Sequence, residues 1–125
     1  MEKFLAIALG GALGAILRVY VSEGVMHKIG LAFPYGTMVV NLIGCLLIGL
    51  CLGAYILRPD WPEWIRFLLV AGGLGAFTTF STFAFELLDL LLGGQYGQAL
   101  MYGGIQLIGG LLLCWVGILI TRAVL

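Results

Sequence analysis

Residues 72–83 read GGLGAFTTFSTF and lie inside an apolar run at 65–92. As one continuous helix that run would be about 40 Å long, against a hydrocarbon core of about 30 Å. Its middle does not resemble a plain lipid-facing segment, because three glycines stand beside four hydroxyl side chains and three phenylalanines. Glycines weaken a helix, and backbone groups freed in a membrane need partners in protein or in a water-lined cavity. The pattern predicts a broken membrane helix that carries the functional site.

The motif also fits a second interpretation, an ordinary packing face. Gly, Ser and Thr are common wherever two membrane helices approach closely. The repeated order of hydroxyl and phenyl side chains favours a binding site instead. Phe80 and Phe83 stand three residues apart, so a helix places both rings on one face.

The composition limits the function classes. The chain has 125 residues, of which 62% are hydrophobic and 10% charged, with a mean hydropathy of +1.16. These values exclude a water-soluble globular domain. Six basic and six acidic residues cancel, so nothing predicts a nucleic-acid partner. Cys45, Cys51 and Cys114 fall in apolar runs without metal-ligand spacing. No nucleophile–base or metal-ligand set indicates an enzyme.

Four segments are long enough to span a membrane. They make one all-α transmembrane domain over 1–125, with expected spans at 4–22, 35–57, 65–92 and 98–123. The connectors, at 23–34, 58–64 and 93–97, are too short to fold as domains. The first span is not expected to be a cleaved signal peptide, because no A-x-A-like site precedes a polar domain. The function is therefore expected within the membrane.

Two polar side chains interrupt the first two spans. Arg18 follows Gly10 and Gly14 on one helical face. It is either a snorkelling anchor at the membrane edge or a cation at the mouth of an anion path. Asn41 is an amide deep in an apolar run, and a buried amide is costly unless its groups are paired. It either bonds a neighbouring helix or donates an N–H to a ligand.

The later spans carry two further candidate features. Glu86 lies deeper than Asp89, and it either lines a vestibule or reaches water at the span's end. The fourth span has one face of small or polar residues, which suits either helix packing or the wall of a narrow path. Their spacings are 3, 4, 4, 3 and 4, and the residues are Gly103, Gln106, Gly110, Cys114, Gly117 and Thr121.

The polar groups in the spans are mostly hydrogen-bond donors, and no carboxylate stands mid-span beside Asn41 or the central motif. That composition suits an anion better than a cation, and the positive edges of phenyl rings can also face an anion. Four spans can hardly enclose a water-lined path alone, so a homo-oligomer is expected. Four cationic residues are expected on one side of the membrane and two on the other. This difference is a weak bias, which permits insertion in both orientations. These residues are Lys3, Arg58, Arg66 and Arg122 against Arg18 and Lys28.

The ordered motifs resemble the Fluc (CrcB) family of fluoride channels over essentially the whole chain. The matching motifs are Gly10-Gly11…Gly14…Arg18, then Pro34-Tyr35-Gly36-Thr37…Asn41…Gly44, then Gly75…Thr78-Thr79-Phe80-Ser81-Thr82-Phe83. The resemblance implies an antiparallel, dual-topology homodimer with two fluoride pores and a structural sodium ion at its centre. It implies that backbone carbonyls of Gly75 and Thr78 bind the sodium.

The resemblance also implies site residues. Those matching the family's pore are Asn41, Phe80 and Phe83, with Ser81 and Thr82 in the same motif. Arg18 matches a vestibule arginine, and Glu86 matches an acidic position near the pore end. Tyr102 and Gln106 fall on a polar track of the fourth helix. Further along that track this chain departs from the pattern, because Gly110 and Cys114 stand where relatives often carry Ser or Thr.

The expected function is therefore passive, fluoride-selective export through the cytoplasmic membrane of a bacterium, which lowers cytoplasmic fluoride and confers fluoride resistance. Fluoride, sodium, membrane lipid and a second copy of the chain are the expected partners. An alternative is a small multidrug-resistance-type, proton-coupled exporter, which needs a carboxylate deep in the first span. That span offers only Glu2, at its edge. A non-transporting assembly subunit would explain the glycines but not Asn41 with the Phe-Ser-Thr-Phe order.

Overall fold

The computed structural model describes residues 1–125 and contains helices without strands. Four of its helical rods are long and apolar enough to cross a membrane. The first two are α1 (Glu2–Ile29) and α2 (Tyr35–Leu57). The third comprises α3 (Glu63–Arg66), the π-helix η1 (Phe67–Leu74), α4 (Gly75–Phe77) and α5 (Phe80–Leu92). The fourth comprises α6 (Tyr96–Gly104), the π-helix η2 (Ile105–Gly109) and α7 (Gly110–Val124).

The all-α, four-span prediction is confirmed, and the chain is a multi-pass membrane protein. Long apolar side chains cover much of its outer surface, as a lipid-facing surface requires. One boundary was predicted wrongly. The first helix continues to Ile29, so residues 23–29 are helical rather than part of a connector. The helix ends where Gly30 adopts a positive φ of 115°, a conformation that glycine accepts without steric cost.

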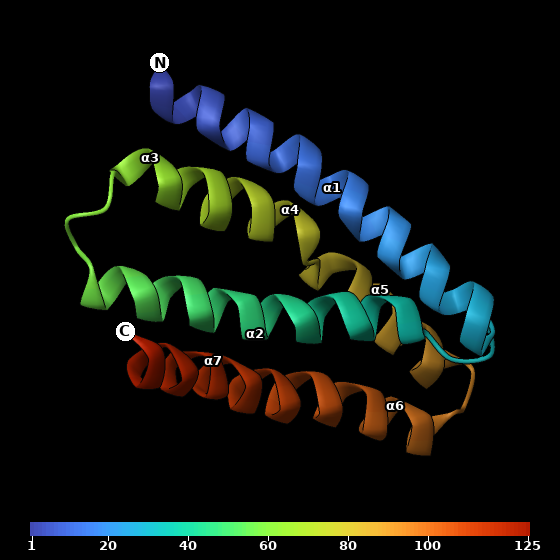
Figure 1. Ribbon diagram of the computed structural model, residues 1–125. Helices are drawn as coiled ribbons and strands as arrows, with labels where there is room; N and C mark the ends of the chain where they lie inside the picture. The colour runs from blue at the N-terminus through green and yellow to red at the C-terminus, as the bar shows by residue number, and fades with distance from the viewer.

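The four rods lie side by side in two pairs (Figure 1). The third rod packs against α1 through η1 and α4, α2 packs against α1 and α7, and α5 packs against α6. Close backbone approach holds each pair together. A Cβ on Gly14 would collide with the carbonyl oxygen of Gly73, and a Cβ on Gly49 would collide with that of Cys114. Glycine at these positions therefore permits the helix contacts that small residues favour in membranes.

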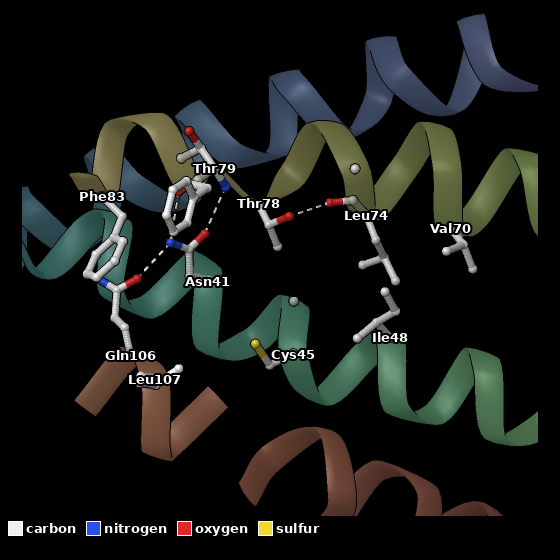
Figure 2. A pocket seen from close by; sticks show the side chains of 13 residues that line it. Asn41, Cys45, Ile48, Val70, Leu74, Thr78, Thr79, Phe83, Gln106 and Leu107 are labelled. Atoms are coloured by element: carbon white, nitrogen blue, oxygen red, sulfur yellow. Dashed lines mark hydrogen bonds between the residues drawn. The ribbon is translucent and has the colours of Figure 1, made fainter. Parts of the chain in front are cut away.

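The third rod is interrupted between α4 and α5. Thr78 (φ −91°, ψ 159°) and Thr79 (φ −151°, ψ 116°) are extended, so the helical hydrogen-bond ladder stops there. A new helix starts at Phe80, where the Thr79 hydroxyl accepts the N–H of Thr82 at 3.3 Å and acts as its N-cap. The interruption falls beside the second turn of α2, where Asn41 lies (Figure 2).

Candidate functional site

Asn41 pairs with the backbone of the interrupted helix. The N–H of Thr79 donates to Asn41 Oδ1 at 2.8 Å, and Asn41 Nδ2 donates back to the Thr79 carbonyl at 3.0 Å. The same nitrogen donates its second hydrogen to Gln106 Oε1 at 2.7 Å. Both amide hydrogens are therefore committed within the chain. Of the two roles expected for Asn41, the structure shows the bond to neighbouring helices.

Gln106 continues this chain of amides and ends it with a free donor. Its oxygen is turned to Asn41 and its nitrogen to the ring of Phe83 (Figure 2). Nε2 is buried and has no hydrogen-bond partner. An unpaired buried donor costs about 1–3 kcal/mol, which a hydrogen-bond acceptor bound at this position would recover. Gln106 lies on η2, and π-helical turns are often found at functional sites.

A cavity of about 370 Å³ brings together half of the predicted site residues. It lies between α2, the interrupted third rod and the fourth rod (Figure 2). The predicted residues that line it are Asn41, Gly75, Thr78, Phe80, Phe83 and Gln106. Amide, hydroxyl and phenyl groups make up its polar and aromatic part, and no charged side chain lines it. Such a lining can hold a partly dehydrated ion without a full opposing charge.

The two phenylalanines differ in their surroundings. Their ring centroids lie 5.8 Å apart with planes at 57°. Phe83 is half-buried and stacks on Tyr102, with centroids 5.3 Å apart and planes at 26°. Phe80 is 79% exposed, so in this single chain one side of its ring has no protein neighbour. The rings thus form a pair of which one member is fixed and the other is free.

Glu86 sits in a cluster of hydroxyl groups. Thr37 Oγ1 donates to Glu86 Oε1 at 2.8 Å, and the hydroxyl of Tyr102 donates to Oε2 at 2.6 Å. Tyr102 is fully buried, and the predicted polar track therefore meets the acidic position directly. Thr37 was not among the predicted site residues. Its position one turn before Asn41 on α2 was the available signal.

Arg18 lines a second cavity, of about 270 Å³, with Ser22, Thr37, Thr79 and Thr82 among its walls. The Nε of Arg18 is buried without a partner. Thr82 Oγ1 accepts a hydrogen bond from Thr79 Oγ1 at 3.0 Å, which leaves the hydrogen of Thr82 free to donate. Glu23 is the one acidic residue in the lining. Thr79 lines both cavities, so the interruption in the third helix stands between them.

The interruption also frees two carbonyl oxygens. In a continuous helix the Gly75 carbonyl would accept the N–H of Thr79, but that N–H donates to Asn41. The Thr78 carbonyl would accept the N–H of Thr82, which donates to the Thr79 hydroxyl. Neither carbonyl accepts another backbone hydrogen bond. Unpaired carbonyl oxygens are the ligands that hard cations prefer.

Two predicted residues lie apart from these groups. Ser81 is exposed and lines neither cavity, although it belongs to the central motif. Cys114 packs its backbone against Gly49 of α2, two turns beyond Gln106, and lines neither cavity. The fourth-helix track therefore reaches the site through Tyr102 and Gln106.

Comparison with known proteins places the chain in a family. The model of the CrcB-like protein family, also described as Camphor Resistance (CrcB), matches residues 5–118. Proteins named "Fluoride-specific ion channel FluC" are similar over nearly their full length. The one from Acidobacterium capsulatum is 42% identical, over 98% of this chain and 98% of its own. The one from Chloroflexus aurantiacus is 43% identical, over 98% of this chain and 97% of its own. One from Bordetella petrii is 43% identical, over 97% of this chain and 92% of its own. The predicted membership is thereby confirmed, and the chain belongs to the CrcB family of membrane proteins.

Proposed function

We propose that this protein is a passive, fluoride-selective channel that exports fluoride across the cytoplasmic membrane and so lowers cytoplasmic fluoride. The observation that carries the proposal is Gln106 Nε2, a buried and unpartnered donor aimed at Phe83. Fluoride is a small, strong hydrogen-bond acceptor, and it must exchange its water for such donors when it enters a narrow path. The names of the full-length relatives agree with this substrate.

The assignment of donors follows from the hydrogen bonds. Asn41 orients Gln106 and holds the interruption, while Gln106 Nε2 and the edges of Phe80 and Phe83 face the ion. On the other side of Thr79, Arg18 and the Thr82 hydroxyl attract the anion into the second cavity. No cationic side chain lines the central cavity, so its sites bind the anion weakly. Weak successive sites allow the ion to leave as well as enter.

The proposal includes an antiparallel homodimer. Phe80 is 79% exposed although it lines the central cavity, so a second chain is needed to close the path around it. The two chain termini and the loop between α2 and α3 lie at one end of the molecule (Figure 1), near Lys3, Arg58, Arg66 and Arg122, whereas Lys28 lies near the far end of α1 and Arg18 lies within α1. The resulting charge bias is weak enough for chains to insert in both orientations.

A structural sodium ion belongs to the same proposal. The carbonyl oxygens of Gly75 and Thr78 fit the role, because both have lost their helical donors. Two chains would supply four such oxygens at the dimer centre. When bound, sodium would be coordinated by these carbonyl oxygens in place of their lost hydrogen-bond donors. The helix could then stay interrupted in both subunits.

Fluoride efflux from liposomes that contain only the purified protein tests the function. We expect fluoride to leave down its gradient without an added energy source, and chloride to leave far more slowly under the same conditions. Empty liposomes are the control. Efflux that requires a proton gradient, or equal efflux of chloride, would refute a passive fluoride-selective channel.

A further inference from the structure

Two thiols lie side by side where α2 packs against α7. Cys45 and Cys114 are both free cysteines, and they lie on facing turns of the two packed helices. Cys45 Sγ lies 3.1 Å from the position that a Cβ on Gly110 would occupy, and Gly110 is one turn before Cys114. The two thiols therefore occupy neighbouring positions on two helices that run in the same direction.

The helix contact fixes the spacing of this thiol pair. Gly49, one turn after Cys45, packs directly on the backbone of Cys114. A Cβ on Gly117 would lie 2.6 Å from the carbonyl oxygen of Leu46, so the backbones remain close on the next turn as well. Two ligands on rigid, closely packed helices are held ready for one bridging ion, and little conformational entropy is lost when it binds.

The donor set selects the chemistry of the ion. No group of three or more His, Cys, Asp or Glu side chains is available to complete a tetrahedral site, which excludes the four-coordinate geometry that structural zinc requires. Two thiolates suit soft cations that accept two sulfur ligands, such as Hg²⁺, Ag⁺ and Cu⁺. We propose that Cys45 and Cys114 form a two-thiolate binding site for one soft metal ion, which bridges α2 to α7.

The binding step is a ligand exchange without oxidation. With neutral HgCl₂, each S–H bond breaks and is replaced by an S–Hg bond, and two protons and two chloride ions are released. The 370 Å³ cavity, whose wall includes Cys45, gives the reagent access to the Cys45 thiol, from which the metal can reach Cys114. Neutral HgCl₂ can reach it through an apolar environment, which a hydrated cation cannot do at comparable cost.

Cys51 provides a matched control within α2. It is also a free, half-buried thiol, but it lines a different cavity, with Tyr55, Trp61 and Arg66, that contains no second thiol. A single thiol leaves one coordination position of mercury to chloride. The pair and the single thiol therefore yield products of different composition.

Native mass spectrometry of the purified full chain, treated with one equivalent of HgCl₂ and desalted, distinguishes these products. The parent and Cys51→Ser proteins should each gain one mercury, lose two hydrogens and retain no chloride. Cys45→Ser and Cys114→Ser should give only chloride-bearing adducts. Cys45→Ala and Cys114→Ala should behave in the same way, which separates loss of the thiol from an effect of the introduced hydroxyl.

The parent protein alone can overturn the inference. Only chloride-bearing adducts on the parent, or loss of the chloride-free product in Cys51→Ser, would show that Cys45 and Cys114 do not bridge the ion. The measurement does not involve fluoride, so its failure leaves the proposed function intact. Gel-filtration profiles that match the parent would confirm that each variant is folded.

Discussion

At the scale of single residues, the structure divides roles that the motif alone merges. Asn41 and Gln106 are both amides, yet Asn41 donates both of its amide hydrogens to groups within the chain, while Gln106 retains a free donor. Phe80 and Phe83 share a face, yet Phe83 is stacked on Tyr102 and Phe80 is exposed. The sequence predicted which residues belong to the site. Their hydrogen bonds and packing in the fold determine which of them are free to contact an ion.

The two phenylalanines should differ when each is replaced. Phe80→Ile and Phe83→Ile remove an aromatic edge from the path, and both should reduce fluoride efflux at least tenfold while the dimer still assembles. Phe83→Ile also loses its stack on Tyr102, which costs about 0.5–1.5 kcal/mol more. Efflux rates and thermal unfolding in detergent measure the two effects. Parental efflux in both variants would contradict a role for the rings.

Asn41→Asp should damage the interruption itself. One carboxylate oxygen can still accept the Thr79 N–H, but the other replaces Nδ2 and so faces both the Thr79 carbonyl and Gln106 Oε1 without a hydrogen to donate. We expect a loss of about 1–3 kcal/mol of stability for each donor removed, together with loss of efflux. Thermal unfolding is the first measurement. Efflux lost at unchanged stability would instead favour direct contact between Asn41 and the ion.

At the scale of elements, glycine contacts and the interrupted rod explain what periodicity could and could not predict. The apolar runs predicted four helices, and Gly10 and Gly14 marked a packing face that α1 indeed presents to η1. The extra turns of α1 were missed because residues 23–29 are polar enough to resemble a connector. The bonds of Thr37 with Glu86, and of Asn41 with Gln106, depend on how two rods are rotated about their axes. Residue spacing within one helix contains no information about that rotation.

Gly14→Ala should destabilise the contact between α1 and η1. Its Cβ would collide with the carbonyl oxygen of Gly73, which belongs to a packed backbone and cannot easily move. We expect a loss of about 1–3 kcal/mol. Gly11→Ala is the matched control, because a Cβ there meets nothing within 4 Å and alanine favours helix by about 1 kcal/mol. Equal unfolding temperatures for the two variants would contradict this packing.

At the scale of the whole molecule, the proposed dimer and its sodium ion would determine how the protein assembles. One chain leaves Phe80 open on one side and two carbonyls without donors, at Gly75 and Thr78. A second, inverted chain would complete both features at once. These parts of the interpretation rest on the family resemblance and remain predictions.

Sodium removal should weaken the assembled protein. An ion that binds only the folded dimer contributes about 2.7 kcal/mol when it is present at 100 times its dissociation constant. Replacing Na⁺ with a bulky organic cation should therefore lower the unfolding temperature, and returning Na⁺ should restore it. Lithium and potassium at equal ionic strength serve as controls for general salt effects. An unfolding temperature that is independent of sodium would rule out a structural ion at this position.

Both orientations should be found in the membrane. Reporters fused to the C-terminus, one active only in the cytoplasm and one only outside it, should each give signal because the charge bias is weak. Adding two lysines to the connector at 58–62 should strengthen the bias and silence one of the reporters. A single active reporter in the parent protein would establish one fixed orientation and contradict dual topology.

The pairing of Asn41 with Thr79 also bears on how the chain is made. Its two partners lie 38 residues apart, and the amide precedes the extended segment in the sequence. During synthesis α2 therefore enters the bilayer first, and its amide is already in place when the weak point of the third rod arrives. The peptide N–H and C=O of Thr79 can exchange their hydrogen bonds with water or the insertion machinery directly for those with Asn41. They then never face lipid without a partner. The order of the chain thus protects the interrupted helix at the moment of insertion.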